Sequence, residues 1–313
     1  GIQKLLGQLP HLCKEIYKLL ITGKGWLVIA VVVFITIFIC NSQKVIYSDD
    51  EKKKDEYYQE YGGKDYSGFT EIIELRKAEV KEAAEKLEEA QEQFEKGEID
   101  ENTVSKYVYN YMDSTRLLDS MNEYMEQINY VEEVNAQYGI EAYVMSQRGY
   151  NQILGDNAKI RKLIIYIILG FGIVLIAESE NALEYKSGMN MLLGSSARGR
   201  IWGKAVKSGA VCIIAAIIAV IVNITEMSVM SHTYGMPYID APLISLSFMK
   251  VGKMLRYITI KQYMIMQLGV YILYSLLVSI ETMAVSRYIF KKNSNREVPL
   301  LIVLNTIVLF III

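Results

Sequence analysis

Long apolar runs are the feature that most restricts what this chain can fold into. A helix needs about 20 predominantly apolar residues to cross the hydrocarbon core of a bilayer. Four runs meet this requirement, and each has at most one acidic residue and no Lys or Arg: 26–40 with its flanks, 163–177, 208–230 and 263–285. A fifth run, 298–313, is still apolar at the last residue. We therefore predict an all-α, polytopic membrane protein with five visible transmembrane helices.

The two ends of the sequence suggest a longer protein. The chain begins at Gly1 without an initiator Met and ends on three isoleucines, so we expect at least one further span. A secretory signal peptide is the alternative for the first run. That run is longer than a typical signal core, however, and no small-x-small cleavage pattern follows Cys40.

Charge divides the chain into three parts. Residues 44–160 hold 27 of the 35 acidic residues and 14 of the 33 basic ones, whereas the flanks are basic. We predict three regions: 1–43 with an amphipathic helix and the first span, an extracellular helical hairpin at 44–160, and the remaining spans at 161–313. Residues 10–22, with apolar positions opposite Lys14 and Lys18, form either an interfacial helix or an extension of the first span.

Basic residues in the short connecting segments predict the orientation in the membrane. Such residues favour the cytoplasmic side, and they cluster before the first span, between the second and third, and between the fourth and fifth. This pattern places segments 44–160 and 231–262 outside the cell. Arg161 and Lys162, at the outer end of the second span, are exceptions that a long translocated domain tolerates.

Apolar residues recur at heptad spacing within the acidic region and predict a coiled-coil hairpin. Gly97 is expected to end the first helix and Asp100 to cap the second. The predicted seam contains Ile73, Val80, Leu87, Phe94, Tyr111, Leu118 and Met125. Such a hairpin is either a spacer or dimerisation stalk, or a docking surface for an extracellular peptide or an accessory protein.

No pattern in the sequence indicates catalysis. Phosphate-binding loops, dinucleotide-binding glycine motifs and GxSxG are missing. Three cysteines and two histidines exclude a disulfide framework and a Cys/His zinc site, so we expect no metal. Glu226 and Glu281 lie within apolar runs, where burying an ionisable group costs free energy. We therefore treat both as candidate functional residues. Either could instead lie at the membrane interface and be solvated.

The segment between the second and third spans carries a recognisable order of residues. It contains, in order, Glu184, Gly188, Leu192 with Leu193, Ser196, Arg198 or Arg200, and Lys204. This order resembles the cytoplasmic loop of type-2 ABC exporter permeases, in which an acidic residue, Gly, a Leu pair, a small or Pro turn, Arg and Lys follow one another. Ser196 stands where Pro is common in that family.

The resemblance implies that segment 178–204 contacts a cytosolic ATPase. The implied contact residues are Glu180, Glu184, Tyr185, Gly188, Leu192, Leu193, Arg198, Arg200 and Lys204. The alternative is an ordinary juxtamembrane loop whose basic residues contact anionic lipid. The family also implies six spans in the full chain, a second permease chain forming a homodimer or heterodimer, and two ATP-binding subunits.

The expected function is accordingly that of a permease subunit of an ABC exporter that moves a peptide or a lipid-like compound. The chain itself would not be an enzyme and would need no cofactor, because the partner ATPase would bind ATP and Mg. Membrane lipid is the other expected partner, and we expect the chain to bind no nucleic acid. A membrane scaffold that senses or resists antimicrobial peptides through the hairpin, without transport, is the alternative function.

Overall fold

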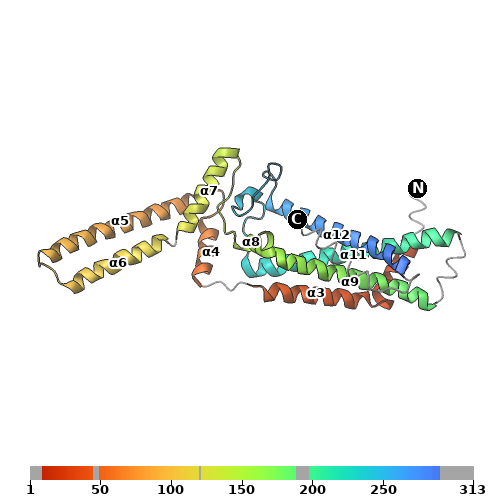
Figure 1. Cartoon of the computed structure of the whole chain (residues 1–313). Helices are drawn as coiled ribbons and strands as arrows, with labels where there is room; N and C mark the ends of the chain where they lie inside the picture. Colours follow the sequence, from red (N-terminus) through yellow and green to blue (C-terminus); the bar gives the residue numbers. More distant parts are fainter. Residues whose placement is uncertain (1–8, 45–48, 120, 188–196, 290–313) are drawn as a thin grey trace. The chain divides into compact units, whose positions relative to one another are not determined.

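The computed structural model describes residues 9–44, 49–119, 121–187 and 197–289 (Figure 1). Side chains at several helix ends, including 180–187 and 197–202, lie outside this description. Within the described ranges the only β-structure is two isolated bridges. The helices are α2 (Leu9–Tyr17), α3 (Gly25–Ser42), α4 (Asp49–Tyr61), α5 (Ser67–Glu95), α6 (Glu101–Asp119), α7 (Asn122–Tyr138), α8 (Arg148–Leu154), α9 (Asn157–Ser187), α11 (Ala197–Tyr234) and α12 (Ile260–Ile289), with a π-helical turn η1 (Lys18–Thr22) and a 3-10 turn η2 (Leu243–Ser245).

Four helices are long and apolar enough to span a membrane. The spans are Gly25–Ser42 in α3, Ala158–Ser179 in α9, Gly203–Tyr234 in α11 and Ile260–Val285 in α12. They contain the first four apolar runs of the sequence, so the prediction of an all-α polytopic membrane protein is confirmed for these helices. The fifth predicted span, 298–313, lies outside the described residues.

The chain folds into two compact units. The membrane unit comprises residues 1–45, 148–235 and 264–313, and the hairpin unit comprises 46–147 and 236–263. The hairpin unit thus differs from the predicted 44–160 region at both ends. Residues 148–160, which form α8 and the start of α9, belong to the membrane unit, whereas the segment 236–263 joins the hairpin unit.

Side-chain hydrogen bonds to backbone carbonyls attach segment 236–263 to the rest of the hairpin unit. The Tyr130 hydroxyl donates to the Ile244 carbonyl at 2.8 Å, and the Gln127 amide donates to the Ser245 carbonyl at 3.2 Å. The Tyr238 hydroxyl donates to the carbonyl of Gly62 at 3.0 Å. These bonds satisfy carbonyls of the short turn η2 and of Gly62, which would otherwise lose hydrogen bonding on burial.

The composition of the hairpin unit agrees with four membrane crossings. Residues 46–147 connect the first and second spans, and residues 236–263 connect the third and fourth. If each candidate span crosses the membrane once, these two connections are on the same side, as their packing into one unit requires. The connection between the second and third spans would then be on the opposite side.

Helices α5 and α6 form an antiparallel hairpin (Figure 1). At the end of α5, Gly97 has a φ of +75°, and its N–H donates to the Phe94 carbonyl at 2.9 Å. The Glu98 N–H donates to the Gln93 carbonyl, also at 2.9 Å, which completes a Schellman motif. The Asp100 carboxylate then accepts the Thr103 N–H at 3.1 Å. The predicted roles of Gly97 and Asp100 are therefore confirmed.

The second arm of the hairpin is shorter than the heptad pattern suggested. The predicted seam runs on through Leu118 to Met125, but α6 ends at Asp119 and a separate helix, α7, begins at Asn122. On α7 the apolar face of Tyr124, Ile128 and Val131 is buried in the core of the hairpin unit rather than along α5 and α6. The prediction of one continuous second helix was wrong, because the same spacing also suits a second, independently packed helix.

The predicted seam positions are covered to different degrees. Ile73 is buried, Phe94 near the hairpin tip is 46 % exposed, and Met125 packs against the core of the hairpin unit. The other positions are partly buried: Val80, Leu87, Tyr111 and Leu118. The coiled-coil assignment stays a prediction.

An aromatic cluster forms the centre of the hairpin-unit core. Tyr124 of α7 lies against Tyr58 of α4 and Phe69 of α5, with ring centroids 4.7 and 4.9 Å away. The Tyr124 hydroxyl reaches the Lys54 carbonyl at 3.1 Å, so its polar end is also satisfied. This cluster fixes α4, α5 and α7 relative to one another.

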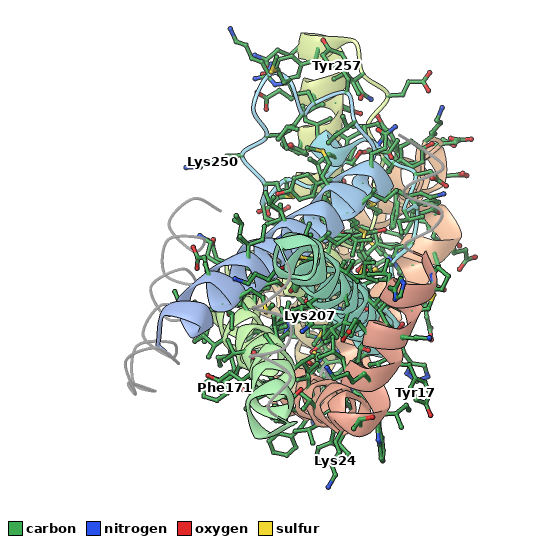
Figure 2. All side chains as sticks on the ribbon, turned by 90° about the vertical axis from the view of Figure 1, so that its right-hand side faces the viewer. Tyr17, Lys24, Phe171, Lys207, Lys250 and Tyr257 are labelled. Atoms are coloured by element: carbon green, nitrogen blue, oxygen red, sulfur yellow. The ribbon has the colours of Figure 1, made fainter. Side chains whose placement is uncertain are left out.

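A sharp turn separates the N-terminal helix from the first span. Lys24 adopts a left-handed backbone conformation with φ 55°, between η1 and α3, and its side chain points outward (Figure 2). A Cβ on Gly23 would lie 2.8 Å from the Leu19 carbonyl oxygen, so glycine permits the close approach. The amphipathic helix is therefore a separate element, packed against α11, and not a continuous extension of the first span. Its location at the membrane interface stays a prediction.

Candidate functional site

An ion pair is buried between two membrane spans. The Arg161 Nε of α9 lies 3.0 Å from Oε1 of Glu226 in α11. The side chains are 1 % and 2 % exposed, and Arg161 also donates to the carbonyl of Gln152 in α8. Glu226 is thus buried and paired, so the alternative of a solvated carboxylate at the interface was wrong for this residue.

Tyrosines of the fourth span complete the cluster. The Tyr271 hydroxyl donates to Oε2 of Glu226 at 2.8 Å, so each carboxylate oxygen has its own donor. Tyr271 stacks on Tyr166 of α9, with centroids 4.6 Å apart. The Tyr274 hydroxyl donates to the backbone carbonyl of Tyr166 at 3.0 Å. Side chains of α9, α11 and α12 therefore meet at one buried carboxylate.

The arrangement explains how charges are tolerated within the spans. Moving a carboxylate and a guanidinium out of water is expensive, and their attraction offsets that cost only with good geometry and further hydrogen bonds. Both conditions hold here, because Glu226 accepts from Arg161 and Tyr271, and Arg161 also has the Gln152 carbonyl. The cluster ties three spans together, and removal of one partner would leave an uncompensated charge.

The second acidic residue predicted from the apolar runs lies elsewhere. Glu281 is partly buried on α12, ten positions beyond Tyr271, or about 15 Å along the helix. The Glu281 side chain has polar or electrostatic interactions at that position. Among the described residues, the hydrogen-bond partners of Arg161 are Glu226 and Gln152. The structure therefore does not bring Glu226 and Glu281 into one site.

The predicted ATPase-contact residues lie at and beyond the ends of α9 and α11. Glu180, Glu184 and Tyr185 belong to the part of α9 that continues past the apolar span, which ends at Ser179, and Arg198 and Arg200 belong to the start of α11. Their side chains lie outside the described part of the structure. Lys204 is exposed on α11. Gly188, Leu192 and Leu193 lie outside the described residues.

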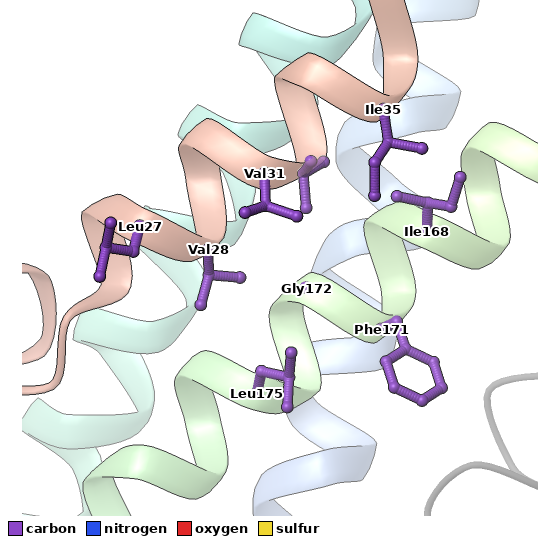
Figure 3. Close-up of a pocket in the computed structure, with 9 residues that line it drawn as sticks. Leu27, Val28, Val31, Ile35, Ile168, Phe171, Gly172 and Leu175 are labelled. Carbon is purple, nitrogen blue, oxygen red and sulfur yellow. The ribbon is translucent and has the colours of Figure 1, made fainter. Parts of the chain in front are cut away.

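A shallow apolar groove of about 350 Å³ runs between α3 and α9 (Figure 3). Val28, Val31 and Ile35 of α3 face Ile168 and Leu175 of α9 across it, so every wall is apolar. Gly172 lies on the floor of the groove, where a Cβ would come within 2.7 Å of the Val32 side chain. Glycine at this position therefore lets the two spans approach closely.

The described residues contain no group of three or more His, Cys, Asp or Glu side chains that could hold a metal ion. The buried cluster pairs one acid with one base and one tyrosine hydroxyl, which suits a structural or conformational role within the membrane. No protein-family model, curated protein or solved structure matches the chain.

The sequence indicated one half of the buried pair but not the other. Glu226 stood out as an acid within an apolar run, whereas Arg161 was interpreted as a tolerated charge at a span end. A usable signal was present, because Arg161 and Glu226 are opposite charges near the ends of consecutive spans that face the same side. Tyr166, Tyr271 and Gln152 gave no comparable signal, since none of them carries a charge that is costly within an apolar run.

Proposed function

We propose that this chain is the membrane subunit of a bacterial ABC exporter. It would work with a second permease chain and two copies of a separate ATP-binding subunit. The transported compound would be a peptide or a lipid-like molecule, and residues 44–160 would be extracellular. ATP and Mg would bind to the partner, so this chain would contribute the path across the membrane and no chemistry.

The observation that carries the proposal is the extension of two spans beyond their apolar part, on the side of the permease-like segment. α9 continues from Ser179 to Ser187, and α11 begins at Ala197, before its apolar part starts at Gly203. Eight and six residues of helix extend about 12 and 9 Å. Helical ends of this length would present Glu184 and Arg200 to a cytosolic subunit.

The buried cluster supplies a way to transmit movement. Closure of the ATPase pair would displace the projecting ends of α9 and α11. Since Arg161, Glu226 and Tyr271 join these two helices to α12, the three spans would move as one body. The apolar groove between α3 and α9 would then be the boundary at which this body moves against the first span, and its walls suit an acyl chain or an apolar side chain of the cargo.

Co-purification tests the proposal. We expect a tagged chain, isolated from its native membranes, to bring with it a subunit that binds ATP. The double substitution Glu184→Lys with Gly188→Trp should abolish this association while the chain still inserts in the membrane. Glu88→Lys on the exposed face of α5 is the control and should leave association unchanged. An undiminished association in the double variant would contradict the assignment of segment 178–204.

The alternative sensor function makes a different prediction. A scaffold that binds an antimicrobial peptide through the hairpin unit would retain peptide binding but show no ATP-dependent movement of peptide across proteoliposomes. Movement that requires the ATP-binding subunit supports the exporter.

A further inference from the structure

A second cation lies beside the buried pair and has no carboxylate of its own. Lys162 follows Arg161 on α9, and its Nζ donates to Oε1 of Gln267 in α12 at 3.1 Å. No carboxylate among the described residues lies within 4.0 Å of this ammonium group. The charged groups near enough to act on it are Glu226, which Arg161 already neutralises, and Arg161 itself. The cluster therefore carries one uncompensated positive charge.

The Lys162–Gln267 pair offers hydrogen-bond donors but no further acceptor. A lysine ammonium has three N–H groups, and only one is used in the bond to Gln267. Because an ammonium can only donate, it fixes the Gln267 Oε1 as acceptor and leaves the Nε2 amide, with its two N–H groups, directed elsewhere. No partner of Nε2 occurs within the described residues. Unused donors from two spans therefore lie beside one another, as a site for an anion requires.

The depth of the pair in the bilayer indicates the kind of anion. Lys162 directly precedes the apolar run 163–177 of the second span. Gln267 lies four residues, or about 6 Å, after the start of the apolar run 263–285 of the fourth span. The polar headgroup zone of a bilayer is about 5–8 Å deep on each side of the hydrocarbon core, and a pair at the start of two apolar runs lies close to the boundary between the two.

The location of the ammonium group favours a lipid over solvent as its partner. A lysine near a helix end usually extends along its own helix toward water. Here the bond to Gln267 holds Lys162 against the neighbouring span, and both side chains are only partly buried, so the membrane phase can reach them. An unpaired charge at this depth is costly, and a phosphate would remove that cost.

We propose that Lys162 and Gln267 form a binding site for the phosphate headgroup of an anionic phospholipid. The phosphate oxygens would accept from the remaining Lys162 N–H groups and from Gln267 Nε2, and one negative charge would balance the surplus of the Arg161, Lys162 and Glu226 cluster. A zwitterionic lipid brings its own cation and would balance it poorly. The lipid would bridge α9 and α12 on the membrane-facing side of the buried carboxylate. This site does not depend on the proposed transport function.

Native mass spectrometry of the full chain in detergent tests the site, with phosphatidylglycerol and phosphatidylcholine of identical acyl chains as probes. We expect the wild type to retain phosphatidylglycerol in preference to phosphatidylcholine. Lys162→Gln should weaken phosphatidylglycerol binding about tenfold or more, since it removes the charged donor. Lys159→Gln is the matched control one turn earlier on α9. Lys159 is exposed and paired with Asp156, so its replacement should leave binding unchanged.

A second variant keeps the test decisive if Lys162→Gln folds poorly. Gln267→Glu places a carboxylate against Lys162 and neutralises the surplus charge within the protein, so the chain should stay folded and lose its preference for phosphatidylglycerol. Wild-type affinity in both variants would overturn the proposal. Equal retention of the two lipids by the wild type would overturn it as well. Displacement of phosphatidylglycerol by an equal concentration of inorganic phosphate would show that free phosphate, and not a lipid, is the ligand.

Discussion

Arg161 and Glu226 lie 65 positions apart in the sequence, and their side chains meet at 3.0 Å where both are almost fully buried. The carboxylate is shared with Tyr271, so a single acidic group holds side chains from three membrane spans. Loss of one member should therefore affect the whole membrane unit and not one helix alone.

Glu226→Leu should be strongly destabilising, because it leaves the Arg161 guanidinium buried without its counter-charge. Breaking a buried pair in this way costs about 3–5 kcal/mol. Tyr271→Phe should cost less, about 1.5–3 kcal/mol, since Glu226 keeps Arg161 and loses only one donor. Thermal unfolding of the purified chain in detergent measures both. Thr225→Ala, which removes a hydroxyl bond within α11, is the control. Equal stability of Glu226→Leu and Thr225→Ala would contradict the role of the pair.

Stability at the start of α6 should depend on pH. Hydrogen bonds from the Thr103 hydroxyl and N–H lower the pKa of Asp100 below its usual value of 3.8. Because the folded state favours the ionised carboxylate, the cap contributes its full stabilisation to α6 at pH values above 3.8. This stabilisation is lost as the pH falls through the lowered pKa of Asp100. Hydrogen exchange in the first turn of α6, corrected for the intrinsic rate, should therefore accelerate in acid.

Asp100→Asn provides the matched comparison for this effect. Asparagine caps a helix about as well as aspartate but does not titrate in this range. The variant should keep the first turn protected and lose the acid dependence. An acid response that persists in Asp100→Asn would assign it to other groups.

The α5–α6 hairpin should respond to substitution on its inner face and not on its outer face. Leu87→Asp places a charge at a half-buried position between the helices and should cost on the order of 2 kcal/mol or more. Glu88→Lys, on the exposed face, should change stability by less than about 1 kcal/mol. The two variants can be compared by measuring amide hydrogen exchange of α5 and α6 in the full chain. If the two substitutions increased exchange equally, the division between seam and surface would be wrong.

Labelling with an impermeant thiol reagent tests the membrane arrangement. In a background without Cys13, Cys40 and Cys212, a cysteine at Glu92 or at Met254, which is 92 % exposed, should react on intact cells. These positions belong to the two chain segments of the hairpin unit. A cysteine at Ser196 should react only after the cells are opened. Opposite reactivity of Glu92 and Met254 would be incompatible with four crossings.

Local signals predicted the helices and their ends better than the contacts between them. The run at Gly25–Ser42 required a span by its composition alone, and Gly97 and Asp100 fixed the hairpin turn because their roles depend on a few neighbouring residues. The break between α6 and α7 was hidden, because Leu118 and Met125 keep the heptad spacing across it. Asp119 and Asn122, both favoured in turns, were the local sign of that break.

Long-range partners could not be derived from periodicity. Apolar spacing shows which face of a helix is covered but not what covers it, so the contact of Arg161 with Glu226 and that of Tyr130 with Ile244 emerge only from the folded chain. The same limit applied to segment 236–263, whose association with residues 46–147 depends on side chains far away in sequence.

ATP hydrolysis by the complex isolated through this chain tests the central claim most directly. The proposed exporter predicts that wild-type chain purified from its native membranes carries an ATPase activity that the chain produced alone lacks. This activity should disappear from preparations of the Glu184→Lys and Gly188→Trp double variant and remain in Glu88→Lys. Wild-type preparations from native membranes without any associated ATP hydrolysis, or activity that persists fully in the double variant, would contradict the account.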